Sequence, residues 1–191
     1  ITKIYFGNGI MNTVEDAHKI KLELEKAYLP MLKQKYPNEL FQFDLAFNQS
    51  INFSKDTDEV FFQKDQNAGK IKDDRNAEEN LKQIQFLEKK SYSDIGDLYN
   101  RNVYLARLKL NYFNIGTTEN HLQKYRSDLL EGKRVIVIAH SQGNIFANRA
   151  VEKILEQNSN QKDKISILGI ASPDNKVINN NPYLTAHDDL V

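Results

Sequence analysis

The sequence predicts an α/β fold, a three-layer α/β/α sandwich built around a mostly parallel sheet. Two observations support this. Short apolar runs rich in β-branched residues recur along the chain, and amphipathic helical segments alternate with them. Strands that are apolar throughout are typical of a parallel sheet covered on both faces. At 191 residues the chain is long enough for one domain with a sizeable core. We therefore expect residues 1–191 to form a single domain.

The first two predicted strands flank a long helix. Residues 1–6 form a short apolar run that ends in the Gly-Asn-Gly turn of residues 7–9. Residues 13–16 have the pattern of a capping box, and apolar residues then recur at helical spacing as far as Pro30. In residues 41–48, large apolar side chains alternate with polar or small ones, as in a strand.

The middle of the chain, about residues 49–115, reads as an insertion or cap-like segment. It is polar and irregular up to about residue 90, with a helical part that begins near Asn76. Further helices are predicted over residues 94–112 and 118–130.

The last third returns to alternating strands and helices. Strands are predicted at residues 134–139, 165–170 and 183–187, and apolar spacing marks a helix over residues 145–155. The chain starts at Ile1 and stops at Val191, each within a strand-like run, so we expect a longer protein truncated at the C-terminus.

Composition excludes several classes of function. Lys plus Arg and Asp plus Glu both number 26, and the basic residues are scattered, which argues against a nucleic-acid partner. No apolar run reaches the ~20 residues of a transmembrane segment, so we expect a soluble protein, cytoplasmic or secreted. Cysteine is absent, and no metal-binding or cofactor-binding motif occurs. We expect neither a metal nor a cofactor, and the sequence leaves the oligomeric state open.

The turn after the predicted strand 134–139 carries the clearest chemical pattern. Residues 139–143, AHSQG, fit G-x-S-x-G with Ala in the first position. The motif needs small residues at both ends because its serine sits on a sharp strand-to-helix turn. Such a turn aims the Ser141 hydroxyl off the sheet edge and places the N–H of Gln142 at a helix N-terminus, where it can stabilise an oxyanion. The alternative is a serine that only caps the helix.

The stretch VIVIAHSQGN resembles the nucleophile elbow of the α/β-hydrolase superfamily, and its A-H-S-x-G form is similar to that of bacterial lipases. The resemblance covers about residues 1–15 and 120–191. It implies the α/β-hydrolase fold with Ser141 as nucleophile. Gly7-Asn8-Gly9-Ile10 resembles the oxyanion loop of this family, with Asn8 where many members have His, which makes Ile10 the second oxyanion donor beside Gln142. The alternative is an ordinary tight turn.

The resemblance also implies the catalytic acid. The run TAHDDLV resembles the family strand whose end carries it, so Asp188 is the candidate, with Asp189 the alternative if the register differs by one. Asp174 is a third candidate, because some lipases carry the acid one strand earlier. A solvated turn is the alternative for the Asp-Asp pair.

The general base is missing from the family order of Ser, acid and His, since no histidine follows Asp188. His140 directly precedes Ser141 and His187 directly precedes Asp188, so neither has the place in the chain that the base has in this family. His18 and His121 suit surface or partly buried positions. We expect the base beyond Val191. The sequence thus predicts a serine hydrolase that cleaves carboxylic ester, including lipid, substrates through an acyl-enzyme. The alternative is an inactive hydrolase-like domain that binds a protein or lipid partner.

Overall fold

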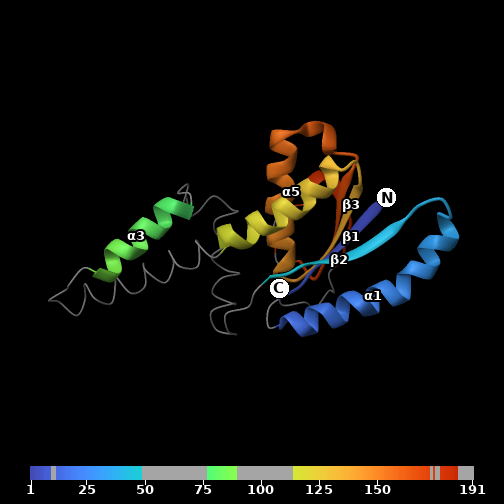
Figure 1. Ribbon diagram of the computed structural model, residues 1–191, viewed down its shortest axis with the longest axis horizontal. Helices are drawn as coiled ribbons and strands as arrows, with labels where there is room; N and C mark the ends of the chain where they lie inside the picture. Colours follow the sequence, from blue (N-terminus) through green and yellow to red (C-terminus); the bar gives the residue numbers. More distant parts are fainter. Residues whose placement is uncertain (10–11, 49–76, 90–113, 173, 175–176, 185–191) are drawn as a thin grey trace.

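A computed structural model describes residues 1–9, 12–48, 77–89, 114–172, 174 and 177–184. Its centre is a five-stranded, all-parallel sheet of order β2-β1-β3-β4-β5 (Figure 1). The strands are β1 (Thr2–Gly7), β2 (Phe41–Ala46), β3 (Arg134–His140), β4 (Ile165–Ile170) and β5 (Tyr183–Leu184). The predicted α/β class with a parallel sheet is confirmed.

Helices lie on both faces of this sheet. On one face, α1 (Val14–Lys35) packs Ala17 against Phe6 and Leu45. On the other face, α5 (Gly143–Gln157) and a helix over residues 114–130 enclose the larger core. That core contains Tyr5, Leu122, Tyr125, Leu129, Val135, Val137, Ala147, Val151, Ile154, Ile165 and Ile167. A further helix, α3 (Ala77–Lys89), lies away from the sheet (Figure 1).

Three helices differ in their bounds from those predicted, and the smallest difference is in α5, which covers Gly143–Gln157 rather than residues 145–155. The capping box is present, because the Thr13 hydroxyl accepts from the Asp16 N–H and the Asp16 carboxylate accepts from the Thr13 N–H. However, α1 continues through Pro30 to Lys35. Pro30 is on the exposed side, where water can bind the carbonyl that proline leaves without a donor. The third predicted helix begins at residue 114 rather than 118.

The order of the strands creates a switch in chain direction between β1 and β3. From β1 the chain proceeds to β2 on one side, and from β3 it proceeds to β4 on the other. In open parallel sheets, the crevice outside the carboxyl ends of the strands at such a switch point is where ligands bind. The loops after β1 and β3 therefore occupy the place where a site is expected.

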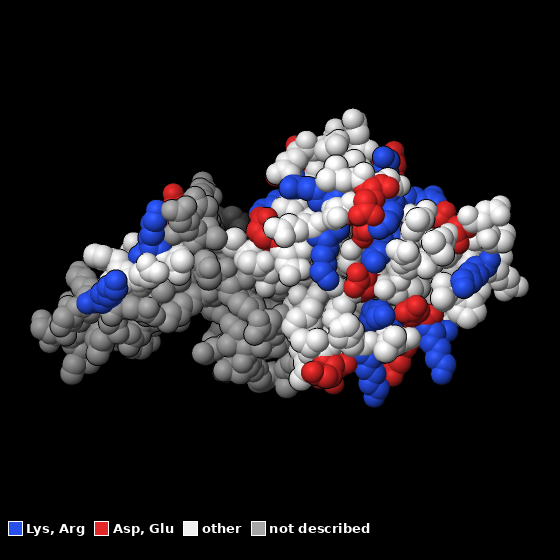
Figure 2. All heavy atoms as spheres, viewed as in Figure 1, with Lys and Arg blue, Asp and Glu red and all other residues white. Residues whose placement is uncertain are grey.

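The surface carries both signs of charge. Figure 2 shows Lys and Arg interspersed with Asp and Glu over the visible face of the described residues. Within the described part of the chain, no helix is both long and apolar enough to cross a membrane.

Candidate active site

Ser141 is held in a strained turn at the switch point. It follows β3 directly and has a φ of 51°, in the left-handed region that side chains with a Cβ rarely adopt. Its N–H donates to the carbonyl of Ile170 at the end of β4, at 2.9 Å, and α5 begins at Gly143. Such strain persists only where the surroundings impose it, and it is concentrated at functional sites. The predicted sharp strand-to-helix turn is therefore present.

The small residues of the AHSQG turn are explained by close packing. A Cβ added to Gly143 would lie 2.5 Å from the Gly7 carbonyl oxygen and 2.7 Å from that of Asn8. These are backbone atoms of the β1 strand and its loop, so they cannot move aside cheaply. Ala139, at the other end, is fully buried, and its Cβ would be 3.9 Å from a Cβ placed on Gly7. A methyl group fits at position 139, but nothing larger than hydrogen fits at position 143.

The loop after β1 lies directly against the serine. A Cβ added to Gly9 would lie 2.9 Å from Ser141 Cβ and 2.9 Å from His140 Nδ1. Glycine at position 9 is therefore what allows the loop to approach the nucleophile candidate. Ile10, the predicted second oxyanion donor, lies outside the described residues, but its neighbour Gly9 is in contact with Ser141.

Gln142 occupies the position expected of the first oxyanion donor. It is the residue before the first turn of α5, and within the described residues its backbone N–H makes no hydrogen bond to a backbone carbonyl. N–H groups at a helix N-terminus lack partners in the helix and favour negative charge. The Gln142 side chain is 2% exposed, and its Nε2 has no hydrogen-bond partner in the described part of the chain.

Asn144 ties the turn to the neighbouring strand, a role that sequence reasoning did not identify. Its Nδ2 donates to the carbonyl of Ser141 at 2.9 Å and to that of Ile170 at 3.0 Å. A Cβ added to Gly169 would lie 2.7 Å from Asn144 Oδ1, so a glycine in β4 makes room for this side chain. These contacts fix the turn from the side of β4.

The candidate acids are only partly described. Asp188 and Asp189 lie outside the described residues. Asp174 follows β4 at the same sheet edge as Ser141, and its Oδ2 accepts from Asn148 Nδ2 at 2.8 Å. It lines a pocket of about 210 Å³ with Asn144 and Ser172, and Ser141 is not among the residues lining that pocket. The structure thus directs Asp174 toward α5 rather than joining it to Ser141 in one cavity.

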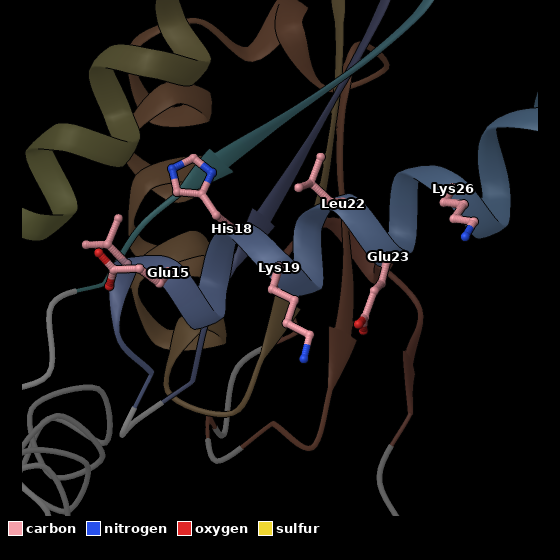
Figure 3. Close-up of a pocket in the computed structure, with 7 residues that line it drawn as sticks. Glu15, His18, Lys19, Leu22, Glu23 and Lys26 are labelled. Carbon is pink, nitrogen blue, oxygen red and sulfur yellow. The ribbon is translucent and has the colours of Figure 1, made fainter.

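The described histidines do not supply an evident base. His140 is exposed, with its ring against Gly9. His18 lies on the outer side of α1, in a shallow apolar depression of about 490 Å³ with Val14 and Leu22 (Figure 3). His187 lies outside the described residues.

His121 differs from the partly buried residue that the sequence suggested. It is fully buried beside Phe146, and its Nδ1 is 3.1 Å from the Tyr125 hydroxyl. Burial lowers the pKa of His121 to about 4, so its ring is neutral at pH 7. It therefore belongs to the packing between the helices and the sheet.

Comparison with protein-family models, with curated proteins and with solved structures finds no match to this chain. Among the described residues, no group of three or more His, Cys, Asp or Glu side chains is placed to hold a metal ion.

Proposed function

We propose that this chain is a serine hydrolase of the α/β-hydrolase type, which cleaves carboxylic ester bonds through an acyl-enzyme on Ser141. The observation that carries the proposal is the left-handed backbone of Ser141 at the switch point, with Gly9 packed against it. A serine that only caps a helix has extended backbone geometry, and its own hydroxyl bonds to the helix. Neither is found here, since the residue before α5 is Gln142 and it has helical angles.

The mechanism assigns a role to each group around the serine. The Ser141 hydroxyl attacks the ester carbonyl, and the N–H groups of Gln142 and Ile10 hold the resulting oxyanion. A histidine from outside the described residues takes the serine proton and gives it to the departing alcohol as the ester C–O bond breaks, which leaves the acyl group on Ser141. Asp188 orients this histidine, with Asp189 and Asp174 as the other candidates. Water, deprotonated by the same histidine, then attacks the acyl-enzyme and releases the carboxylic acid, and the proton returns to Ser141. Without an adjacent base a serine hydroxyl is a weak nucleophile, so this histidine is essential to the proposal.

Labelling with a fluorophosphonate probe tests the proposal on the full-length protein. We expect stoichiometric labelling of the wild type, loss of labelling in Ser141→Ala, and retained labelling in Ser166→Ala, a half-buried serine within β4. Hydrolysis of p-nitrophenyl esters of short and long acyl chains then separates esterase from lipase activity. A folded full-length protein that is not labelled would contradict the enzyme proposal and favour a hydrolase-like binding module.

A further inference from the structure

A small pocket lies at the carboxyl edge of the sheet, between α5 and the chain that leads into β5. Its volume is about 210 Å³, and its described lining comes from α5, β4 and the chain between β4 and β5. β5 is short and pairs only with Gly169 and Ile170 at the end of β4. Residues 177–182 lead into it, and Ile178 among them packs against the larger core. The pocket is the space left between this segment, β4 and α5.

Asn144 places an unused hydrogen-bond acceptor in the pocket. Asn144 is 1% exposed, and its Nδ2 donates to the carbonyl oxygens of Ser141 and Ile170. Only the NH₂ of an amide can bind two carbonyl oxygens, so Oδ1 points away from the serine turn. It points toward Gly169, where an added Cβ would lie 2.7 Å from it. Within the described part of the chain no group donates to Oδ1, and a buried acceptor without a donor is costly.

Two other side chains of the pocket also have unused hydrogen-bonding capacity. The Ser172 Oγ accepts from the Asp174 N–H at 3.3 Å, and its own O–H donates to no described residue. Asn181 Nδ2 donates to the carbonyl of Ile178 at 2.6 Å, whereas its Oδ1 accepts from no described residue. With Asn144, the pocket therefore offers two amide acceptors and a hydroxyl that can donate or accept.

The remaining lining limits the chemistry of a ligand. Ile167, Ile178 and Pro182 contribute apolar surface. Asp174 is the only charged side chain among the described residues that line the pocket, so an anion would meet a carboxylate and no described cation. Pockets that bind drug-sized molecules usually have volumes of about 300–1,000 Å³, so only a smaller molecule fits here. The pocket suits a small ligand without negative charge that carries both hydroxyl donors and carbon surface.

We propose that this pocket binds a small neutral polyol, of the size of glycerol or a single sugar ring, at a site separate from Ser141. One ligand hydroxyl donates to Asn144 Oδ1, and others bind the side chains of Ser172 and Asn181. The C–H groups of the ligand cover the apolar wall. Water can bind the polar groups but leaves that wall hydrated, whereas a polyol satisfies both kinds of surface. The proposal does not depend on the hydrolase function.

Binding of glycerol, D-xylose and D-glucose to the full-length protein tests the proposal. Isothermal titration calorimetry and saturation-transfer difference NMR, in buffer free of other polyols, measure it, with ethylamine and acetate as charged comparison ligands. We expect saturable binding of at least one polyol in the millimolar range and no binding of acetate. In ¹⁵N-labelled protein, the side-chain NH₂ signal of Asn144 should shift during the polyol titration, because the same amide group accepts from the ligand.

Two serines give a matched pair of variants. Ser172→Leu fills the pocket, whereas Ser166→Leu makes the same change at another half-buried serine, which lies outside the pocket on the opposite face of β4. We expect polyol binding to be lost in the first and unchanged in the second. If Ser172→Leu does not fold, Ser172→Ala and Asn181→Ala take its place. Each removes one neutral hydrogen bond to the ligand, which should weaken binding about twofold to tenfold.

Three results would overturn the proposal. The first is the absence of saturable binding by all three polyols. The second is polyol binding at full strength in folded Ser172→Leu, or in both alanine variants, since the ligand would then lie elsewhere. The third is tighter binding of ethylamine than of every polyol, which would make the pocket a cation site. None of these measurements uses Ser141 reactivity, so failure here leaves the hydrolase proposal standing.

Discussion

The two edges of the sheet use residues with left-handed backbone in opposite ways. At the amino edge, these residues are Gly132, with φ of 78°, and Asn179, with φ of 59°. Glycine and asparagine are the residue types that tolerate this region. At the carboxyl edge, Ser141 and Ala171 adopt φ of 51° and 47°, although neither residue favours it. The residue types therefore suit the left-handed backbone at the amino edge and do not suit it at the carboxyl edge.

The polar contacts of the two edges differ as well. At the amino edge they include ion pairs: Glu39 pairs with Arg134 at 2.8 Å, and Lys133 pairs with Asp128 at 2.7 Å. The carboxylate of Asp128 raises the pKa of Lys133. At the carboxyl edge, the contacts around the serine turn come from the neutral amides of Asn8, Asn48 and Asn144.

This difference indicates a division of tasks. The Arg134 side chain is exposed, so its ion pair with Glu39 is expected to contribute modestly to stability and to tolerate change. Buried neutral amides instead fix geometry and leave costly unpaired groups when they are removed. Proteins depart from locally consistent sequence mainly at functional sites. We therefore expect the carboxyl edge to be the functional edge, and we expect substitutions there to behave differently from similar substitutions at the amino edge.

The largest effect is expected from Gly143→Ala. Its Cβ would lie within 3.0 Å of two backbone carbonyl oxygens, so β1 or α5 must move. We expect a loss of about 3 kcal/mol in the free energy of unfolding, at the upper end for overpacking, together with loss of labelling at Ser141. Urea unfolding measures the first and fluorophosphonate labelling the second.

Gly116→Ala is the matched control for this substitution. Gly116 is exposed in the helix over residues 114–130, and an added Cβ meets nothing within 4 Å. Replacing a helical glycine with alanine should stabilise the protein by about 0.5–1 kcal/mol. Equal stability of the two variants would contradict the close packing inferred at Gly143.

An intermediate effect is expected from exchanging residues at the left-handed positions. Replacing a left-handed residue with glycine relieves backbone strain of about 1–2 kcal/mol in the folded state. Glycine also makes the unfolded chain more flexible, which offsets about 0.4–1 kcal/mol of this gain. Ser141→Gly and Ala171→Gly should therefore each raise the free energy of unfolding by about 0.5–1 kcal/mol, and Gly132→Ala should lower it by a similar amount. Chemical denaturation of the three variants checks this. A destabilised Ser141→Gly would show that the turn is not strained.

The fold was predictable because most of its elements follow simple apolar periodicity. The missed first turn of the helix over residues 114–130 shows where this fails. The buried positions of that turn are Asn114 and Thr117, so the buried side of the turn is polar. An apolar pattern cannot reveal a polar interior. The continuation of α1 past Pro30 was missed for another reason, because it depends on which side of the helix faces solvent.

The site was predictable only where its chemistry is local in sequence. Ser141 and its small neighbours lie within five residues, so the motif alone indicated the turn. By contrast, the buried side chain of Asn8 donates to the carbonyl of Asn48, 40 residues away, and this contact depends on the register of β1 with β2. Likewise, Asn148 meets Asp174 only once α5 and β4 are packed together. Contacts of this kind need the three-dimensional arrangement.

The smallest effect is expected at the amino edge, from Glu39→Gln. The Thr2 hydroxyl first, and then Arg134, lowers the pKa of Glu39 from 4.5 to about 2. A carboxylate with a depressed folded-state pKa adds stability that is complete above its unfolded-state pKa and is lost as the pH falls toward the folded-state value. The wild type should therefore exceed Glu39→Gln in stability above about pH 4.5, and the difference should disappear by about pH 2. Urea unfolding of both proteins across this range measures it, and a difference that persists at pH 2 would show that Glu39 acts through packing rather than charge.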